Sequence, residues 1–286
     1  MIQSETIAGT AAGAGGTIIG FPLDSIKTRM QTSSSSKFRT VSSSVSTIWS
    51  KEGILGFYRG VLSPLCALTL LNSINFTVYA YFRDKIPSQI PYKIIDNIQS
   101  SHIIIPAIAG MCGGPFASII STPFEFLKTN MQVNSKELGN STPIATYRIV
   151  KTYGPLIVFR GHLVNTLREC VFLGTYFGMY ENLKSAFSSS FSDTMAIPLS
   201  GGLSGGIGWF VSFPLDSIKG RIQSYNLKLQ PPSSIQTLKN IVRERGLTGM
   251  YRGLGPSLAR AFIVSSTRFT IYETALSYAR NSQHFT

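Results

Sequence analysis

One short pattern occurs three times along this chain and constrains its fold more than any other feature. Each copy has a proline, an acidic residue two positions later, a lysine five positions later and a glutamine nine positions later. The copies are Pro22-Leu-Asp24-Ser-Ile-Lys27-Thr-Arg29-Met-Gln31, Pro123-Phe-Glu125-Phe-Leu-Lys128-Thr-Asn130-Met-Gln132 and Pro214-Leu-Asp216-Ser-Ile-Lys219-Gly-Arg221-Ile-Gln223. Self-similarity at a nearly constant period of about 90 to 100 residues indicates one structural unit used three times.

Other residues recur with the same period. A pair of glycines four residues apart precedes each proline, and a single glycine and an aromatic-arginine-glycine triplet follow it. The pairs are Gly9 and Gly13, Gly110 and Gly114, and Gly201 and Gly205; the single glycines are Gly53, Gly154 and Gly246; the triplets are Tyr58-Arg59-Gly60, Phe159-Arg160-Gly161 and Tyr251-Arg252-Gly253. We therefore expect three units, 1–92, 93–193 and 194–286, in one integral bundle, with helices approaching closely at the glycine pairs.

The charged residues are few and unevenly placed, which predicts a membrane environment. They make up 14% of the chain, against roughly 25% in soluble domains. Uncharged runs of 18, 22 and 22 residues end at Asp24, Glu125 and Asp216, and a run of 23 lies between Arg59 and Arg83. About 20 apolar residues span a hydrocarbon core. The sequence thus predicts an all-α membrane protein with two transmembrane helices per unit, six in all.

The basic residues gather in the polar segments between the two helices of each unit. Of 26 lysines and arginines, 18 lie in residues 24–60, 125–161 and 216–253. This is the asymmetry of the positive-inside rule, so the formal charge of +13 does not indicate a nucleic-acid partner. In the third segment Ile235, Leu238, Ile241 and Val242 form an apolar stripe, which predicts a short amphipathic surface helix.

No grouping of residues indicates catalysis, a cofactor or a bound metal. The cysteines and histidines are Cys66, Cys112, Cys170, His102, His162 and His284, which are scattered along the chain. Their spacing matches neither a metal site nor a redox motif. We expect the cysteines to behave as small apolar side chains, and we expect the protein not to be an enzyme.

The acid and base of the repeated pattern lie at the end of an apolar helix in each unit. Charges inside a membrane cost about 2.5 to 3.5 kcal/mol each unless they are paired or hydrated. Three symmetric copies could meet as a ring of ion pairs around a pseudo-threefold axis. The alternative is that they are ordinary interfacial charges that extend into water. The threefold recurrence favours the ring, which could serve as a gate.

The triplicated pattern, together with the glycines and the aromatic-arginine-glycine triplets, resembles the mitochondrial carrier family over residues 6–279. The resemblance implies three pseudo-threefold repeats, each with a short matrix-side amphipathic helix, in the mitochondrial inner membrane. It implies a central cavity that opens alternately to either side, both termini in the intermembrane space, and a monomer. The partners it implies are a small-molecule substrate and the lipid bilayer, with cardiolipin as a candidate lipid. Because apolar residues begin almost at the amino terminus, without the features of a leader, we expect internal targeting information.

The resemblance also implies two gates. The matrix gate would consist of the pairs Asp24 with Lys128, Glu125 with Lys219, and Asp216 with Lys27, braced by Gln31, Gln132 and Gln223. The cytoplasmic gate would involve Arg83, Glu181, Lys184 and Glu273. Ala80 and Leu276 occupy positions where that second gate carries charge in the family. Only Arg83 and Glu273 could pair there, so we expect a weak cytoplasmic gate.

Residues that differ among the three units are candidates for reading an asymmetric substrate. Arg168 aligns with Ala67 and Arg260, and the next residue, Glu169, aligns with Leu68. Ionisable residues at this depth are functional candidates, although a structural ion pair is the alternative. Because adjacent helical residues point about 100° apart, we expect Arg168 and Glu169 to border one cavity without pairing well. Together they suit a zwitterion, since an arginine binds a carboxylate and a glutamate binds an ammonium group.

The arginine-acid doublet resembles the carnitine/acylcarnitine, ornithine and related amino-acid carriers. Arg260 resembles the substrate position of the sixth helix in that subgroup. The apolar Ala67, Leu68 and Leu71 favour an acyl chain, a methylated ammonium or an aliphatic side chain over a dibasic amino acid. Asn72 and Asn75 either line the same path or bond between helices. Arg268 is either a second anion contact or a partner for Glu181.

Three functions remain open from the sequence. A carrier that exchanges a zwitterionic or cationic metabolite explains both the symmetric and the asymmetric charges. A scaffold with the carrier fold would usually lose its gate charges. An uncoupler of proton or anion type fits the weak cytoplasmic gate.

Overall fold

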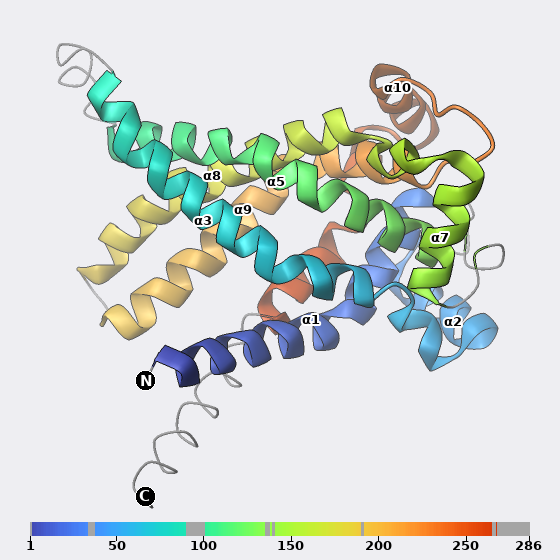
Figure 1. The fold of residues 1–286 in the computed structure, drawn as a ribbon, viewed down its shortest axis with the longest axis horizontal. Helices are drawn as coiled ribbons and strands as arrows, with labels where there is room; N and C mark the ends of the chain where they lie inside the picture. Colours follow the sequence, from blue (N-terminus) through green and yellow to red (C-terminus); the bar gives the residue numbers. More distant parts are fainter. Residues whose placement is uncertain are drawn as a thin grey trace, which may run out of the picture.

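Long helices run nearly the length of the molecule, and short helices gather at one end of them (Figure 1). The computed structural model describes residues 2–33, 38–89, 101–134, 138, 141–189, 192–264 and 267. The long helices are α1 (Ile2–Thr32), α3 (Leu62–Gln89), α5 (Ser101–Val133), α8 (His162–Ser188) and α9 (Asp193–Gln223). A further helical stretch covers residues 254–264. These six segments are the predicted pairs, one pair in each unit.

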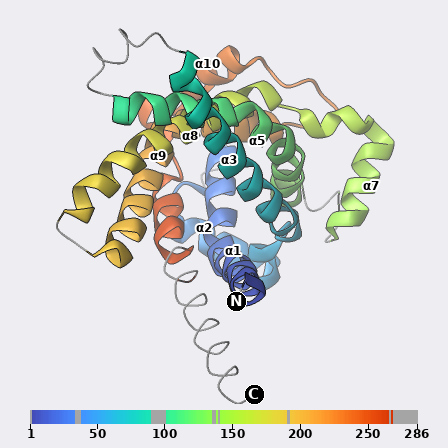
Figure 2. The same ribbon diagram turned by 60° about the vertical axis from the view of Figure 1, so that its left-hand side comes forward.

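A short helix and a 3-10 turn connect the two long helices of each unit. These elements are α2 (Val41–Glu52) with η2 (Ile54–Tyr58), α7 (Thr142–Tyr153) with η3 (Pro155–Phe159), and α10 (Ser234–Arg245) with η4 (Leu247–Tyr251). In Figure 1 α2, α7 and α10 lie at the end of the bundle opposite the start of α1, and Figure 2 shows the same helices with the bundle turned by 60°. Each short helix buries an equivalent isoleucine, Ile48 in α2, Ile149 in α7 and Ile241 in α10. The predicted amphipathic helix is therefore present in all three units.

The repeated glycines take backbone conformations that other residues rarely adopt. Gly53, Gly154 and Gly246 end the short helices with φ of 63°, 83° and 69°. The glycines of the three triplets precede the second long helix of each unit, with φ between 79° and 94°. A side chain at positive φ is strained, whereas glycine is not. These turns therefore require glycine at each position.

The long helices α3, α5, α8 and α9 pack side by side in this order, and α1 contacts α3, α5 and α9. The helices α5 and α8 approach closely at the glycine pair of α5. A Cβ added to Gly110 would lie 2.5 Å from the carbonyl oxygen of Leu173, and one added to Gly114 would lie 2.6 Å from the backbone nitrogen of Cys170. In the third unit the prediction of a close approach is wrong. There the side chain of Tyr176 fills the space, and its nearest atoms lie 3.7 and 4.0 Å from Cβ positions built on Gly201 and Gly205.

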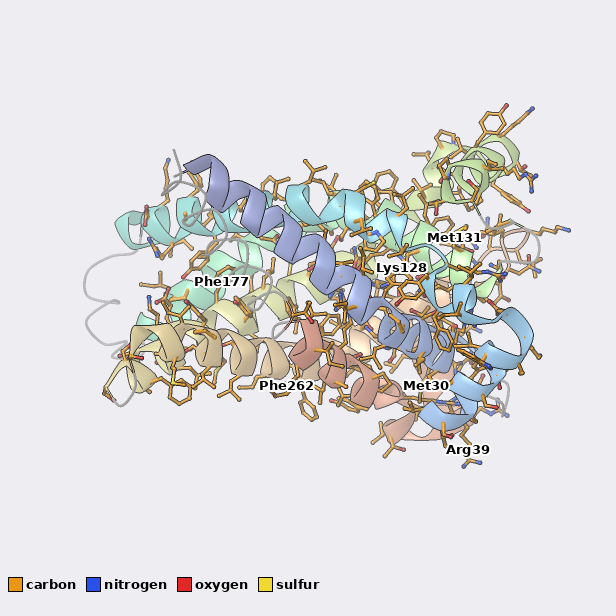
Figure 3. All side chains as sticks on the ribbon, turned by 90° about the horizontal axis from the view of Figure 1, so that it is seen from below. Met30, Arg39, Lys128, Met131, Phe177 and Phe262 are labelled. Atoms are coloured by element: carbon orange, nitrogen blue, oxygen red, sulfur yellow. The ribbon has the colours of Figure 1, made fainter. Side chains whose placement is uncertain are left out.

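The pattern of burial is the reverse of that in a soluble protein. Asp24 and Asp216 are only 6% and 4% exposed, whereas Leu70 is 53% exposed and Phe262, which points outward in Figure 3, is 75% exposed. By length and hydropathy alone, one helix among the described residues, Ile103–Val133, would cross a membrane. The uncharged runs of α1 and α9 are rich in glycine, threonine and serine, which lowers their mean hydropathy. Apolar side chains outside and paired charges inside are typical of a bundle surrounded by lipid.

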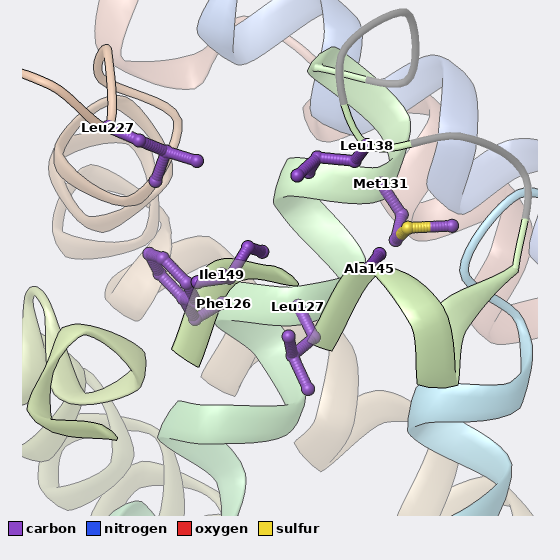
Figure 4. Close-up of a cluster of buried hydrophobic side chains, with 7 residues drawn as sticks. All are labelled: Phe126, Leu127, Met131, Leu138, Ala145, Ile149 and Leu227. Carbon is purple, nitrogen blue, oxygen red and sulfur yellow. The ribbon is translucent and has the colours of Figure 1, made fainter. Parts of the chain in front are cut away.

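A cluster of apolar side chains anchors the short helix of the second unit (Figure 4). Phe126, Leu127 and Met131 of α5 pack with Ala145 and Ile149 of α7. The cluster is completed by Leu138, in the connection between those helices, and by Leu227, which follows α9 in the third unit. The cluster therefore links two units at the end of the bundle where the repeated charges lie.

Candidate substrate cavity and ion-pair ring

The repeated charges form a ring of ion pairs in which each unit contacts the next. Lys128 lies between the helices near Met131 (Figure 3). The pairs are Lys128 Nζ with Asp24 Oδ2 at 2.7 Å, Lys219 Nζ with Glu125 Oε2 at 2.6 Å, and Lys27 Nζ with Asp216 Oδ2 at 2.7 Å. Lys219 also lies 3.7 Å from the second oxygen of Asp216. The structure thus brings together all six charged residues that the resemblance implied.

The glutamines of the pattern differ from the expectation. Gln31 Nε2 donates to Asp216 Oδ2 at 2.9 Å and so braces one ion pair. The side-chain amides of Gln132 and Gln223 are buried, yet within the described part of the chain they have no hydrogen-bond partner. The prediction of three equivalent braces is therefore wrong for these two. Next to Gln223, α5 and α9 are joined instead by Asn130, whose Nδ2 donates to the backbone carbonyl of Gln223 at 3.1 Å.

A cavity of about 340 Å³ lies against the ring. Five basic and four acidic side chains line it, including all six of the ring together with Arg168, Glu169 and Arg260. Ala67 and Leu71 contribute apolar surface, and Asn75 contributes an amide. The side chain of Asn72 and the whole of Arg268 lie outside the described residues. The predicted contact residues that the structure describes thus share one cavity with the ring.

Arg168 and Glu169 form an ion pair, contrary to our prediction. Their Cα–Cβ directions diverge, but the arginine side chain is long enough for its guanidinium to reach back to the neighbouring carboxylate. Ser121 Oγ donates to the same carboxylate at 3.3 Å, and Arg168 lies 3.8 Å from Glu125 of the ring. Both members of the pair are buried. Two unlike charges are therefore held next to each other in the cavity.

Arg260 connects the cavity to the ring. Its Nε lies 2.9 Å from Asp24 Oδ1, while the other oxygen of that carboxylate binds Lys128. Both cavity arginines are thus bound by carboxylates of the protein in this conformation. A substrate carboxylate would compete with those partners for the guanidinium groups.

Trp209 is a cavity residue that sequence reasoning missed. Its ring lies 4.3 Å from Lys27 Nζ and 5.7 Å from the guanidinium of Arg168, and Phe172 packs beside it. In the other units the aligned residues are Thr17 and Ser118. The signal in the sequence is this asymmetry among the first long helices of the three units, which parallels the asymmetry of Arg168 and Glu169 among the second.

At the opposite end of the bundle, the described residues form fewer ion pairs than the ring does. Arg83 is exposed and pairs with its neighbour Asp84 at 3.4 Å. Glu181 accepts a hydrogen bond from Tyr79 at 3.2 Å, and Lys184 lies half-buried on α8. Glu273 lies outside the described residues, and so do the predicted pairs of Arg83 with Glu273 and of Glu181 with Arg268.

The fold and the threefold ring define a class of membrane transport proteins, and comparison with known proteins identifies the family. A family model described as mitochondrial carrier protein matches residues 2–89, 99–191 and 192–283. The chain belongs to the mitochondrial carrier family. It is an all-α, multi-pass transport protein of the mitochondrial inner membrane that binds a small-molecule substrate, and not an enzyme.

Several relatives match over nearly their whole length. The mitochondrial basic amino acids transporter of Bos taurus is 32% identical, over 98% of this chain and 93% of the relative. The mitochondrial arginine transporter BAC2 of Arabidopsis thaliana is 30% identical, over 95% and 90%. The mitochondrial ornithine transporter 1 of Schizosaccharomyces pombe is 30% identical, over 90% and 86%. These relatives are amino-acid carriers by name.

Proposed function

We propose that this protein exchanges amino acids with a basic side chain across the mitochondrial inner membrane. The observation that carries the proposal is the buried Arg168–Glu169 pair in the cavity, with a second arginine, Arg260, also lining it. An amino acid presents a carboxylate and an ammonium group one carbon apart, and the pair offers a complementary charge for each. The names of the relatives support a basic side chain.

In this proposal the α-carboxylate binds the guanidinium of Arg168 or Arg260, and the α-ammonium binds Glu169. The cationic side chain lies against Trp209, whose face attracts cations. Lys27 occupies that face in the present conformation, at 4.3 Å. Substrate binding would therefore exchange protein partners for substrate partners at each charged group, which keeps the buried charges paired throughout.

A carnitine or acylcarnitine is the second candidate. Ala67 and Leu71 give the cavity apolar surface that would suit a methylated ammonium or an acyl chain. The apolar residues of the sequence favoured this class over a dibasic amino acid. The relatives named as basic-amino-acid and ornithine transporters favour the dibasic amino acid instead. The two candidates differ in the hydrogen bonds that the cation can donate, since a trimethylammonium group donates none.

We further propose that the ion-pair ring is the matrix gate. The ring lies at the short-helix end of the bundle, and its three pairs join the three units, so breaking them would let the units separate. Arg83, Glu181, Lys184 and Glu273 would form the weaker cytoplasmic gate. Alternating closure of the two gates would give access to one side at a time and couple entry of one solute to exit of another.

The proposed lipid partner is cardiolipin, bound by a monomer. A largely apolar groove of about 610 Å³ runs between α3 and α7, lined by Leu62, Cys66, Pro143 and Tyr147, among others. Lys151 lines the same groove and supplies a positive charge. Acyl chains in the groove and a phosphate near the lysine would match this lining.

Uptake into liposomes that contain the purified protein tests the proposal. We expect labelled arginine to enter liposomes loaded with arginine, ornithine or lysine, and to be exchanged much less against carnitine or acylcarnitines. Preferred exchange of carnitine would establish the second candidate. No movement of any solute would indicate a scaffold, and collapse of a proton gradient without exchange would indicate an uncoupler.

The variant Glu169→Gln tests the binding mode. Because it removes the negative charge while keeping the shape, arginine uptake should fall by at least about a hundredfold, as expected for an unpaired buried charge. Glu244→Gln, on the surface of α10, is the matched control and should leave uptake unchanged. Wild-type uptake by Glu169→Gln would remove this residue from the site.

A further inference from the structure

Asn165 lies between the cavity and the ring and is fully buried on α8. Its carbonyl oxygen Oδ1 is 3.3 Å from Lys219 Nζ, a member of the ring, and 3.4 Å from Arg168 Nε, a member of the cavity pair. One oxygen therefore accepts hydrogen bonds from two cations that belong to different parts of the molecule.

The amide nitrogen of Asn165 fixes the orientation of this oxygen. Nδ2 donates to Ser121 Oγ at 2.8 Å and to Thr122 Oγ1 at 2.9 Å. Exchanging the nitrogen and the oxygen would place an NH₂ group against two cations, so only one orientation is compatible with the surroundings. Thr122 is held in turn by the carbonyl of Ser118 at 2.6 Å. The acceptor is thus preorganised by α5.

The other two units lack this arrangement. The residues aligned with Asn165 are Pro64 and Ser257, and those aligned with Thr122 are Phe21 and Phe213. Ser257 donates to the backbone carbonyl of Gly253 within its own unit. The polar connection therefore occurs in the unit that carries the Arg168–Glu169 pair, which is where an asymmetric substrate would be read.

We propose that Asn165 is a positioning residue that couples substrate binding to opening of the ring, an inference that rests on the proposed exchange function. Opening requires Lys219 to leave Glu125, after which its remaining carboxylate is that of Asp216, at 3.7 Å on the same helix. A poorly paired ammonium group is strongly disfavoured in this interior. The Asn165 oxygen keeps a partner for Lys219 during that step. When a substrate carboxylate draws Arg168 away, the oxygen becomes fully available to Lys219.

Asn165→Leu, which keeps the approximate volume and removes the acceptor, tests the proposal. Losing a hydrogen bond to a charged group at the moment of opening should lower the turnover of arginine exchange about tenfold or more, with KM changed less than about twofold. A turnover equal to that of the wild type would overturn the proposal. So would a rise in KM at unchanged turnover, because Asn165 would then act in binding.

Asn165→Asp has the opposite effect on the acceptor, because it replaces the amide oxygen with a negatively charged carboxylate. A carboxylate here competes with Glu125 for Lys219 and weakens the closed ring, so we expect a severalfold higher proton leak under an imposed membrane potential, with no substrate present. Asn165→Leu should show no such increase. An unchanged leak in Asn165→Asp would contradict the proposal. This measurement needs no substrate. It therefore tests the role of Asn165 even in the case that the wild type does not exchange amino acids and the proposed function is wrong.

Thr166→Val is the matched control for a purely structural role. Thr166 Oγ1 lies 2.8 Å from Ser118 Oγ across the same α5–α8 interface and 3.0 Å from the backbone carbonyl of His162, and among the described residues it makes no hydrogen bond to Lys219 or Arg168. We expect Thr166→Val to keep wild-type turnover and leak. If it lowered turnover as much as Asn165→Leu does, the effect would come from packing and the coupling role would be refuted.

Discussion

Each lysine that closes the ring has a carboxylate from another unit, and two of them also lie over an aromatic ring. Lys27 lies over Trp209, and Lys128 Nζ lies 5.2 Å from the ring of Phe21. Aromatic faces replace part of the hydration that a buried ammonium group loses. The ring can therefore be closed while remaining reversible, because each of these contacts is individually replaceable.

Gln31, which donates to Asp216, and Gln132, whose amide has no partner among the described residues, give a first prediction. Gln31→Leu removes a hydrogen bond to a charged carboxylate, worth about 1.5 to 3 kcal/mol, and should raise substrate-independent leak through the ring. Gln132→Leu replaces a buried amide that has no partner among the described residues, so leak should be unchanged and the unfolding temperature equal or higher. Flux assays and thermal unfolding of both variants check this. Equal leak in the two would mean that the brace at Asp216 has no effect.

Trp209 gives a second prediction. Removing the aromatic face in Trp209→Leu should raise the KM for arginine about 5- to 30-fold, the range expected from 1 to 2 kcal/mol of cation–π attraction. Trp209→Phe keeps a face and should lose less. The uptake of labelled arginine at graded concentrations measures both. If Trp209→Leu kept the wild-type KM, the cationic side chain would bind elsewhere in the cavity.

At the scale of helices, equivalent positions in different units need not have equivalent packing. The glycine pair of α5 allows contact with the backbone of α8, whereas among the described residues the pair of α9 meets the side chain of Tyr176. The repeat pattern predicts which residues are equivalent, but the size of neighbouring side chains decides how near two helices come. This is why the sequence predicted a close approach in all three units and the structure shows it between α5 and α8.

A matched pair of glycine variants tests this difference. A Cβ on Gly114 would lie 2.4 Å from Cys170 Sγ and 2.8 Å from its Cα, so Gly114→Ala should destabilise the protein by about 1 to 3 kcal/mol through overpacking. Gly205→Ala, at the equivalent position, should change stability by less than about 0.5 kcal/mol. Thermal unfolding in detergent measures both. Equal destabilisation by the two would show that the α8–α9 interface is tighter than described.

At the scale of the whole molecule, symmetry separates what the sequence could predict from what it could not. The repeated pattern predicts that the six charges meet as a ring, and the resemblance to the mitochondrial carrier family implies which of them pair. The contact between Arg168 and Glu169, the unpaired Gln132 and Gln223, and the Asn165 connection depend on side-chain length and on polar neighbours from another helix. The repeated pattern does not encode those contacts, because it does not specify the neighbours that decide them.

The most direct test of the central claim, that the ring closes the matrix side of an amino-acid exchanger, is uptake of labelled arginine into liposomes with and without internal arginine. The wild type should accumulate label only when arginine is inside. Lys128→Ala, which removes one of the three pairs, should also admit label into empty liposomes, while Lys239→Ala on the exposed surface of α10 should behave as the wild type does. Equal dependence on internal arginine in Lys128→Ala and the wild type would contradict the account.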